Sequence, residues 1–188
     1  LSIRRQRQMC IRDRFGAMLK HHGQLGPAEI PSKRDWTYRQ VQWQARAQGT
    51  PLQLPASHPF NSLALLRLAT ACDADGTPNR FVCDKIFRHV WCSGLEAADA
   101  ERLAALNADL KPTGDVASDT VKQQLKAHTE EAIALNLFGV PSMVVDGQVF
   151  WGNDALPMLR AYLQGDAWFQ SPDWTGVAQL PVGVQRKP

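Results

Sequence analysis

The sequence predicts an α/β fold that is mostly helical, with one short β-hairpin near its C-terminal end. Residues 142–145 and 148–151 are short runs rich in Val and aromatic residues. The Asp146-Gly147 pair between them favours the positive φ angles of a two-residue hairpin turn. Upstream of this hairpin, several segments repeat apolar residues at helical spacing and end at Gly, Pro or Asn.

Length and composition exclude several classes of protein. The 188 residues are enough for one domain, or one domain with a large insertion, and 44% of them are hydrophobic. No apolar run approaches the roughly 18 residues of a membrane span. Residues 1–14 hold five arginines and one aspartate, or +4, so the net charge of +3 leaves −1 for the remainder. A nucleic-acid-binding surface is therefore not predicted for the folded part.

The expected helices follow one another along the chain before the hairpin. They cover residues 15–22, 36–48, 62–72, 81–91, 99–110 and about 119–135. Asn61, Asp99 and either Ser118 or Asp119 are the expected N-caps, and Asn136 is a suitable left-handed stop. The aromatic and aliphatic stripe of residues 81–91 is expected to face the core. The adjacent His21 and His22 are read as a solvated pair, because neighbours on a helix face different ways.

The cysteines show no functional spacing. Cys10, Cys72, Cys83 and Cys92 form neither a CxxC motif nor a set of zinc ligands. We therefore expect buried or free thiols in a reducing cytoplasm, and no metal site.

Two features flank the hairpin and predict a ligand site. Val140-Pro141 stands just before the first strand, where proline cannot donate to a ladder and can adopt a cis bond. After the second strand, Asn153 or Asp154 is placed to cap a helix that runs to about Leu163. Backbone groups and a helix dipole are therefore expected to meet at one place.

The run FGVPSMVVDGQVFWGND, residues 138–154, closely resembles the C-terminal part of the 2-hydroxychromene-2-carboxylate isomerases. These are glutathione-using members of the DsbA-like and kappa-class glutathione transferase branch of the thioredoxin fold. The resemblance extends more loosely through GAMLKHHGQLGPAEIPSKRDW and covers about residues 15–163. It implies a thioredoxin-like domain of residues 15–164 with a helical insertion at about residues 24–118, followed by a tail of residues 165–188.

The start of the chain departs from the family pattern. Family members begin with a strand, a helix and a second strand, and this unit has no counterpart here. We therefore expect a chain truncated at its start and without activity, whose strand 142–145 has an unpaired edge prone to aggregation. Residues 1–14 are interpreted as a non-native leader resembling translated adapter or cloning sequence, with a transit-like or nucleic-acid-binding arm as the alternative. The family's catalytic serine lies on the first helix, so no catalytic residue is assigned, and Ser2 is not given this role.

The resemblance further implies a glutathione site beside the hairpin. Val140 would hold the cysteinyl part of glutathione through its backbone N–H and C=O, and Pro141 would remove a competing donor. Asp154 would pair with the α-ammonium group of the γ-glutamyl end, while helix N–H groups near Asn153 take its carboxylate. The simpler alternatives are that Pro141 merely starts a strand and that Asn153 and Asp154 are N-caps.

Three more residues receive roles from the resemblance. Gln24 and Lys33 stand where the relatives use an Asn and a Lys, nine residues apart, to bind the peptide. Gln24 departs from that pattern but keeps a primary amide, and Lys33 offers an ammonium group to a carboxylate. Trp151 would form an aromatic wall of the substrate pocket, or alternatively pack in the hairpin core.

The function implied for the full-length protein is glutathione-dependent cis–trans isomerisation of an aromatic-derived carboxylate in aromatic catabolism. The alternatives are a DsbA-like thiol–disulfide oxidoreductase, a kappa-class glutathione transferase and a non-catalytic glutathione-binding relative. A serine in the first helix would indicate an isomerase or transferase, and CxxC would indicate redox chemistry. The expected partner is a small molecule, with no nucleic acid or membrane partner, in the cytoplasm. A homodimer is left open.

Overall fold

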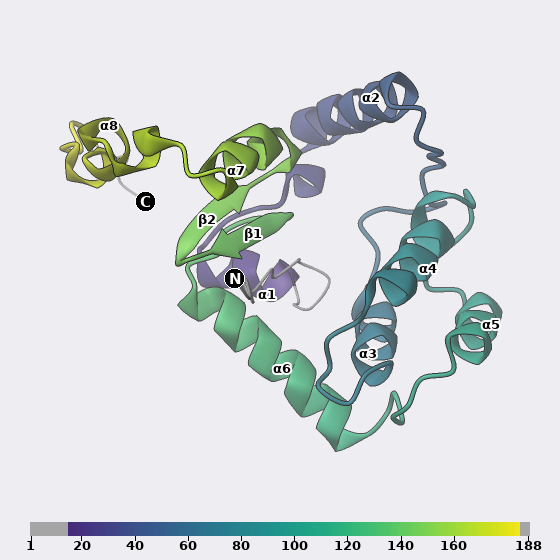
Figure 1. Ribbon diagram of the computed structural model, residues 1–188. Helices are drawn as coiled ribbons and strands as arrows, with labels where there is room; N and C mark the ends of the chain where they lie inside the picture. The colour runs from purple at the N-terminus through teal and green to yellow at the C-terminus, as the bar shows by residue number, and fades with distance from the viewer. Residues whose placement is uncertain (1–14, 185–188) are drawn as a thin grey trace.

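The computed structural model describes residues 15–184, in which helices surround one two-stranded sheet (Figure 1). The α-helices are α1 (Phe15–His21), α2 (Pro31–Ala47), α3 (Leu63–Ala71), α4 (Arg80–Trp91), α5 (Ala100–Leu110), α6 (Asp119–Ala134), α7 (Leu156–Leu163) and α8 (Pro172–Thr175). The strands are β1 (Ser142–Val145) and β2 (Gln148–Trp151), and the 3-10 turns are η1 (Pro27–Glu29), η2 (Asn153–Ala155), η3 (Ala167–Gln170) and η4 (Val177–Gln179). None of the described helices has the length and apolar character needed to cross a membrane.

The hairpin forms as the sequence predicts. β1 and β2 pair antiparallel, and the two turn residues between them, Asp146 and Gly147, have φ angles of 51° and 77°. Both values lie in the left-handed region that a tight two-residue turn requires, which Asp-Gly supplies. The peptide bond between Val140 and Pro141 is cis, as expected.

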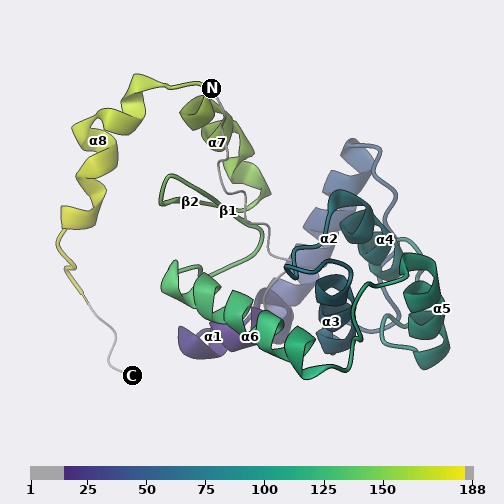
Figure 2. The ribbon, with the colours of Figure 1, turned by 60° about the horizontal axis from the view of Figure 1, so that its bottom comes forward.

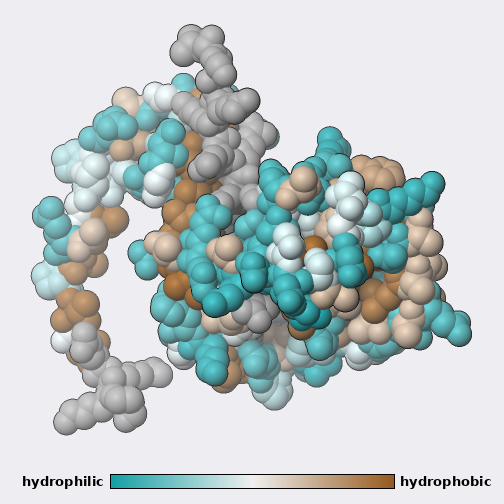
Figure 3. Space-filling model, turned by 90° about the horizontal axis from the view of Figure 1, so that it is seen from below, coloured by the Kyte–Doolittle hydropathy of each residue, from teal (hydrophilic) through white to brown (hydrophobic). Residues whose placement is uncertain are grey.

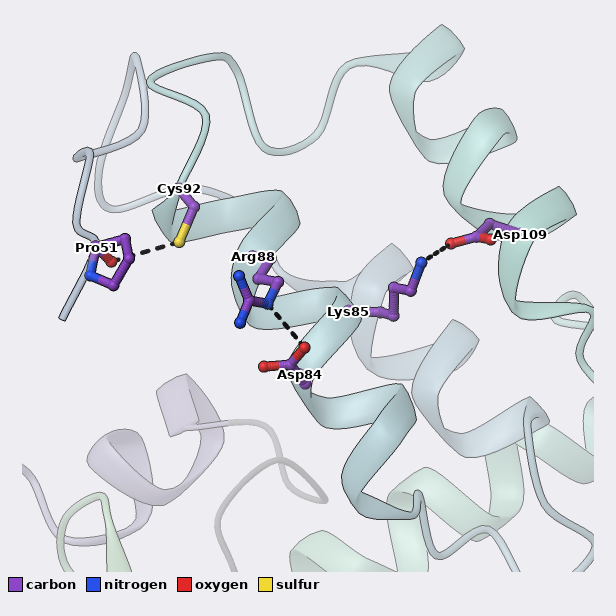
Figure 4. A network of polar contacts seen from close by, with 6 residues as sticks. All are labelled: Pro51, Asp84, Lys85, Arg88, Cys92 and Asp109. Atoms are coloured by element: carbon purple, nitrogen blue, oxygen red, sulfur yellow. Dashed lines mark hydrogen bonds and ion pairs between the residues drawn. The ribbon is translucent and has the colours of Figure 1, made fainter.

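Helices α3, α4 and α5 share one core, on the right of Figure 1. Its buried residues are Leu65, Leu68, Ala69, Val82, Ile86, Val90, Ala97 and Leu106. Asn79 caps α4 by accepting from the Val82 N–H at 3.1 Å, and the predicted cap Asp99 starts α5. An ion pair of 2.7 Å between Lys85 Nζ and Asp109 Oδ2 joins α4 to α5 (Figure 4). This region lies within residues 24–118, the segment expected to be a helical insertion, and is called the insertion below.

Only part of the predicted stripe on α4 faces this core. Val82, Ile86 and Val90 are buried, whereas the side chains of Phe81 and Phe87 are 59% and 43% exposed. Successive residues of a helix turn by about 100°, so residues spaced by four share a face and 81 and 87 fall beside it. The prediction was therefore wrong for the two phenylalanines.

Helix α6 connects the insertion to the hairpin (Figure 1). Ser118 caps it, because its side chain accepts from the Val121 N–H, and Asn136 ends the turn after it with a φ of 54°, as predicted. Towards its N-terminus α6 packs on α3. Near its C-terminus, Ala132 joins a second buried cluster with Met18 of α1 and Val144 of β1.

The segment before the insertion differs from the prediction. Helix α2 begins at Pro31 rather than at residue 36, because proline suits the first helical position, where its missing N–H is not needed. Lys33, which precedes the predicted helix of residues 36–48, therefore lies in the first turn of α2. No residue of α2 is buried, and Trp36 and Trp43 are 65% and 68% exposed.

The tail contains short helices that its sequence pattern did not indicate. η3, α8 and η4 follow α7 in quick succession, and Phe169 is buried against Phe150 and Ala155. Beyond α8 the chain leaves the rest as an arm with exposed hydrophobic surface (Figures 2 and 3). The predicted disorder at the very end concerns residues 185–188, which lie outside the described residues, as does the predicted leader of residues 1–14.

The described cysteines are free thiols, as predicted. Cys72, Cys83 and Cys92 are half-buried and form no disulfide, while Cys10 lies outside the described residues. Burial raises the pKa of the Cys72 and Cys83 thiols, so both resist forming the reactive thiolate.

Candidate functional site

The chain entering β1 and the chain leaving β2 lie side by side. The Gly152 N–H donates to the Pro141 C=O at 2.9 Å. Next to this bond, Ser142 and Trp151 are partners in the strand register. The Gly-Val-Pro and Trp-Gly-Asn-Asp motifs therefore form one surface, although the whole hairpin separates them in sequence.

Val140 presents backbone groups that this surface does not use. Its side chain is 37% exposed, and neither its N–H nor its C=O makes a hydrogen bond to another described residue. The β1 ladder begins only at Ser142, and Pro141 has no N–H to compete. An extended peptide can therefore pair with Val140 as an additional short strand.

Trp151 covers the glycine that precedes Val140. A Cβ added at Gly139 would overlap the Trp151 indole, so the two groups are in direct contact. The Phe138 ring packs edge-on against the same indole, with ring centroids 5.2 Å apart. Trp151 is nevertheless 52% exposed, so its indole contacts Gly139 and Phe138 without being buried in the hairpin core.

Asn153 and Asp154 do not cap a helix with their side chains, contrary to the prediction. Both lie inside η2, whose N-cap is Gly152, and α7 follows with Ala155 as its N-cap. Gly152 has a φ of 91°, and the 3-10 turn begins directly after it. Asn153 and Asp154 therefore lie inside the turn, and neither occupies the N-cap position of η2 or of α7. Helix α7 does end at Leu163, as expected.

The polar groups of Asn153 and Asp154 are left available by this turn. The Asp154 carboxylate is exposed and forms no ion pair or hydrogen bond with another described residue. It lies against Gly152, where an added Cβ would overlap its Oδ1. The backbone N–H groups of Asn153 and Asp154 also donate to no described residue. An anionic oxygen beside free N–H donors is complementary to a group that carries both an ammonium and a carboxylate.

Gln24 and Lys33 are not tied to this surface. Gln24 follows α1, where its backbone N–H donates to the Leu19 C=O at 2.9 Å and its side chain is exposed. Lys33 is exposed on α2, a helix whose main packing partner among the described elements is η1. No hydrogen bond or ion pair within residues 15–184 links either side chain to the residues around the hairpin.

Sequence reasoning missed two residues that shape the site. His22 is half-buried, with Nε2 at 2.9 Å from the Leu137 C=O, so it fixes the loop after α1 to the segment that enters the site. The prediction of a solvated pair was therefore wrong for His22. Gly139 carried a signal in the Gly-Val-Pro motif, whereas the contact of His22 spans 115 positions and no local pattern indicates it.

The groups on this surface are suited to recognising a ligand. Within residues 15–184, no three or more His, Cys, Asp and Glu side chains are grouped to hold a metal ion. What the surface offers is a backbone pairing edge at Val140, a carboxylate and N–H donors at Asp154, and the flat face of Trp151. These groups suit a short peptide with a zwitterionic end, next to an aromatic ligand.

Comparisons with known proteins agree with this fold. The family described as DSBA-like thioredoxin domain matches residues 13–164. A 2-hydroxychromene-2-carboxylate isomerase of Pseudomonas putida is 29% identical over 148 residues, which are 74% of this chain and 70% of that protein. An isomerase of the same name from Pseudomonas sp. strain C18 is 30% identical over 151 residues, covering 76% of this chain and 69% of that protein. A solved structure of a selenomethionine 2-hydroxychromene-2-carboxylate isomerase has a TM-score of 0.70 and 24% identity, over 85% of this chain and 80% of that one. That last likeness shows the common fold.

Proposed function

Because the chain belongs to the DSBA-like thioredoxin domain family and, within it, to the 2-hydroxychromene-2-carboxylate isomerases, we propose that the full-length protein isomerises a small aromatic-derived carboxylate of this kind with glutathione as cofactor. The names of the relatives support an isomerase of aromatic catabolism. The observation that carries the glutathione part is the unpaired backbone of Val140 beside the unpaired carboxylate of Asp154.

Glutathione fits the groups that this surface leaves unused. The Val140 N–H and C=O would pair with the cysteinyl residue, as an added strand does. The Asp154 carboxylate would accept from the α-ammonium group, and the N–H groups of Asn153 and Asp154 would donate to the α-carboxylate. Lys33 and Gln24, both exposed, would supply an ammonium and an amide to the other end of the peptide.

The protein's own residues would bind and orient the reactants. When bound, glutathione would supply a thiolate that adds reversibly to a conjugated double bond and leaves again after rotation about that bond. Val140 would fix the position of the sulfur through the backbone on either side of it. Trp151, which lies on the same surface, would hold the flat ring of the substrate over the cysteinyl residue and exclude water from that face. The group that lowers the pKa of the thiol is not assigned to any described residue.

The thiols of the chain support the cytoplasm as its location. Cys72, Cys83 and Cys92 are unpaired, although a secreted protein of this size commonly joins its cysteines. This proposal concerns the compartment alone, and the reaction does not depend on it.

Calorimetry on Asp154→Asn tests the site. The substitution keeps the shape of the side chain and removes its charge. It should weaken glutathione binding about 10- to 150-fold, which corresponds to the roughly 1.5–3 kcal/mol of a hydrogen bond to a charged group. Asp173→Asn is the matched control, because Asp173 is an exposed aspartate on α8 and should leave the affinity unchanged. Unchanged affinity in Asp154→Asn would remove Asp154 from the site.

Turnover separates the remaining alternatives. The full-length protein is assayed with 2-hydroxychromene-2-carboxylate in the presence and absence of glutathione. Isomerisation only with glutathione is the expected result. Equal turnover without glutathione would contradict the cofactor assignment, and binding of glutathione without turnover would indicate a non-catalytic relative.

A further inference from the structure

A hollow that is open to solvent lies between α3 and α5, and the alanines on its walls, Ala64, Ala104 and Ala117, are exposed. It has a volume of about 370 Å³ and is bounded by α3, α5 and the segment that leads into α6. Helix α5 lies on the side of the insertion away from the β1–β2 hairpin (Figures 1 and 2), so this cavity is separate from the surface around Val140. Its volume falls within the range of small-molecule sites.

The cavity is apolar except for two side chains. Leu68, Leu103 and Val116 and several alanines form most of its wall, with Arg67 of α3 and Asn107 of α5 as the polar members. Arg67 Nε and Asn107 Oδ1 are buried and have no hydrogen-bond partner among the described residues. Buried polar atoms in folded proteins nearly always pair with protein or ordered water, so this donor and this acceptor are available to a ligand that carries complementary groups.

The charge of Arg67 is also unmatched in the described part of the chain. The four ion pairs there use Lys85, Arg88, Lys122 and Lys126 as their cations. Asp115, on the adjoining segment, instead accepts from the Ala117 N–H at 2.8 Å. A guanidinium group presents forked N–H donors whose geometry matches a carboxylate.

The walls of the cavity are held in place independently of any ligand. Leu106 of α5 packs in the core shared with α3 and α4, and Lys85 and Asp109 form an ion pair between α4 and α5 (Figure 4). On the other side, the Gly114 N–H and the Thr113 hydroxyl both donate to the Ala71 C=O, at 3.0 and 3.2 Å, and tie the segment before α6 to the end of α3. A ligand would therefore enter a preformed site rather than order one.

We propose that this Arg67–Asn107 cavity binds a small organic carboxylate that carries a hydroxyl group on a compact apolar or aromatic body. The carboxylate accepts from the Arg67 guanidinium, and the hydroxyl donates to Asn107 Oδ1. The body of the ligand packs against Leu68, Leu103 and Val116. The site does not depend on glutathione or on the hairpin, and it lies beyond the isomerase function proposed above.

Calorimetric titration with 3-hydroxybenzoate tests the site, with neutral 3-hydroxybenzyl alcohol as the comparison. The acid should bind about tenfold or more tightly than the alcohol, because only the acid forms a charge-assisted pair with Arg67. Arg67→Gln should abolish this preference. Arg46→Gln, which removes an exposed arginine of α2, is the matched control and should keep it.

A second variant fills the cavity without changing any charge. Ala104→Leu, on the α5 wall, should prevent binding of 3-hydroxybenzoate while the circular dichroism spectrum and the glutathione affinity stay the same. Glutathione affinity thus separates a failure here from a failure at the hairpin site. Equal binding of acid and alcohol, or unchanged binding in either Arg67→Gln or Ala104→Leu, would overturn the proposal. Absence of binding heat with 3-hydroxybenzoate at millimolar concentration would also overturn the proposal. A bridging water would then be the partner of Arg67 Nε and Asn107 Oδ1. Should Arg67→Gln not fold, Ala104→Leu and the neutral alcohol decide.

Discussion

At Gly139 the backbone passes so close to the Trp151 indole that no side chain fits between them. Gly139→Ala should therefore either displace the indole or strain the turn, and overpacking of this kind costs about 1–3 kcal/mol of stability. Thermal denaturation should show a lower midpoint, and tryptophan fluorescence should shift because Trp151 moves.

The first helix offers a glycine for comparison. A Cβ added at Gly16 of α1 meets no atom within 4 Å. Gly16→Ala should leave stability unchanged or raise it by about 0.4–1 kcal/mol, because alanine has less freedom to lose on folding. A lower midpoint for Gly16→Ala than for Gly139→Ala would contradict the contact with Trp151.

His58 makes the stability of the fold depend on pH. Its Nδ1 lies 2.7 Å from the Tyr38 hydroxyl, and its ring packs against Trp91. Burial, and secondarily the positive charge of Arg34, lowers the pKa of His58 below its usual value of 6.5. The fold therefore favours the neutral ring, whereas the unfolded chain takes up a proton as pH falls below about 6.5. Its contribution is complete above that pH and is lost as pH falls towards the lowered pKa of the folded state.

Thermal midpoints at about pH 7.5 and 5.5 test this dependence across the range in which histidine titrates. Between about pH 7.5 and 5.5 the thermal midpoint of His58→Asn should fall less than that of the wild-type chain. Carboxylates also contribute to the fall in midpoint of both proteins. His21→Asn replaces an exposed ring and serves as the control, with a wild-type loss expected. The same loss in His58→Asn as in the wild type would count against the role of His58.

At the scale of elements, Arg102 of α5 holds the end of α4 in place. Its guanidinium donates to the His89 C=O at 2.7 Å, to Ser93 Oγ at 2.9 Å and to the Glu96 C=O. Arg102→Gln should lower the free energy of unfolding by about 1.5–3 kcal/mol, as for other hydrogen bonds from a charged group. Urea denaturation measures the difference.

Arg88→Gln provides the control on the neighbouring helix. Arg88 pairs with Asp84 at 2.8 Å, but both side chains are exposed to solvent (Figure 4). Exposed pairs one helical turn apart contribute little, so the midpoint should not change. An equal loss in both variants would indicate that Arg102 acts only as a surface charge.

Turns and helix ends that depend on one or two neighbouring residues could be predicted from the sequence. The start of α2 and the exposure of the α4 phenylalanines were not predicted correctly. The Asp146-Gly147 turn, the cap Asp99 and the stop at Asn136 each depend on the conformational preference of one or two residues, and all three were confirmed. Helix α2 begins five residues before the predicted start, because Pro31 suits the first position of a helix and does not break it. The exposure of Phe81 follows from helical spacing, because Val82, Ile86 and Val90 share the buried face and Phe81 falls beside it.

The candidate site divides in the same way. Val140, Trp151 and Asp154 belong to one continuous motif, and the hairpin necessarily brings its two ends together. Lys33 lies more than a hundred residues away in sequence, on an element with no described contact that would bring it to the motif. Its place in the site therefore rests on the resemblance alone and stays a prediction.

At the scale of the whole molecule, the buried side chains fall into separate cores. One lies among α3, α4 and α5, and two others lie on either side of the hairpin. Helix α6 joins them, packing on α3 near one end and on α1 near the other (Figure 1). Because no buried cluster formed by residues 15–184 spans this helix, we expect the insertion and the hairpin region to open separately, as cooperative units of larger proteins do.

Native-state hydrogen exchange on two variants tests this division. Leu106 is 7% exposed in the insertion and Phe150 is fully buried beneath the hairpin, so each alanine substitution should cost its own core about 2–5 kcal/mol. Leu106→Ala should reduce amide protection in α3, α4 and α5 and leave that of β1 and β2 unchanged, and Phe150→Ala should do the reverse. Helix α6, which packs against both regions, should respond to each substitution at the end nearer to it. Equal loss of protection throughout the chain in both variants would show that one cooperative unit, and not two, holds the molecule together.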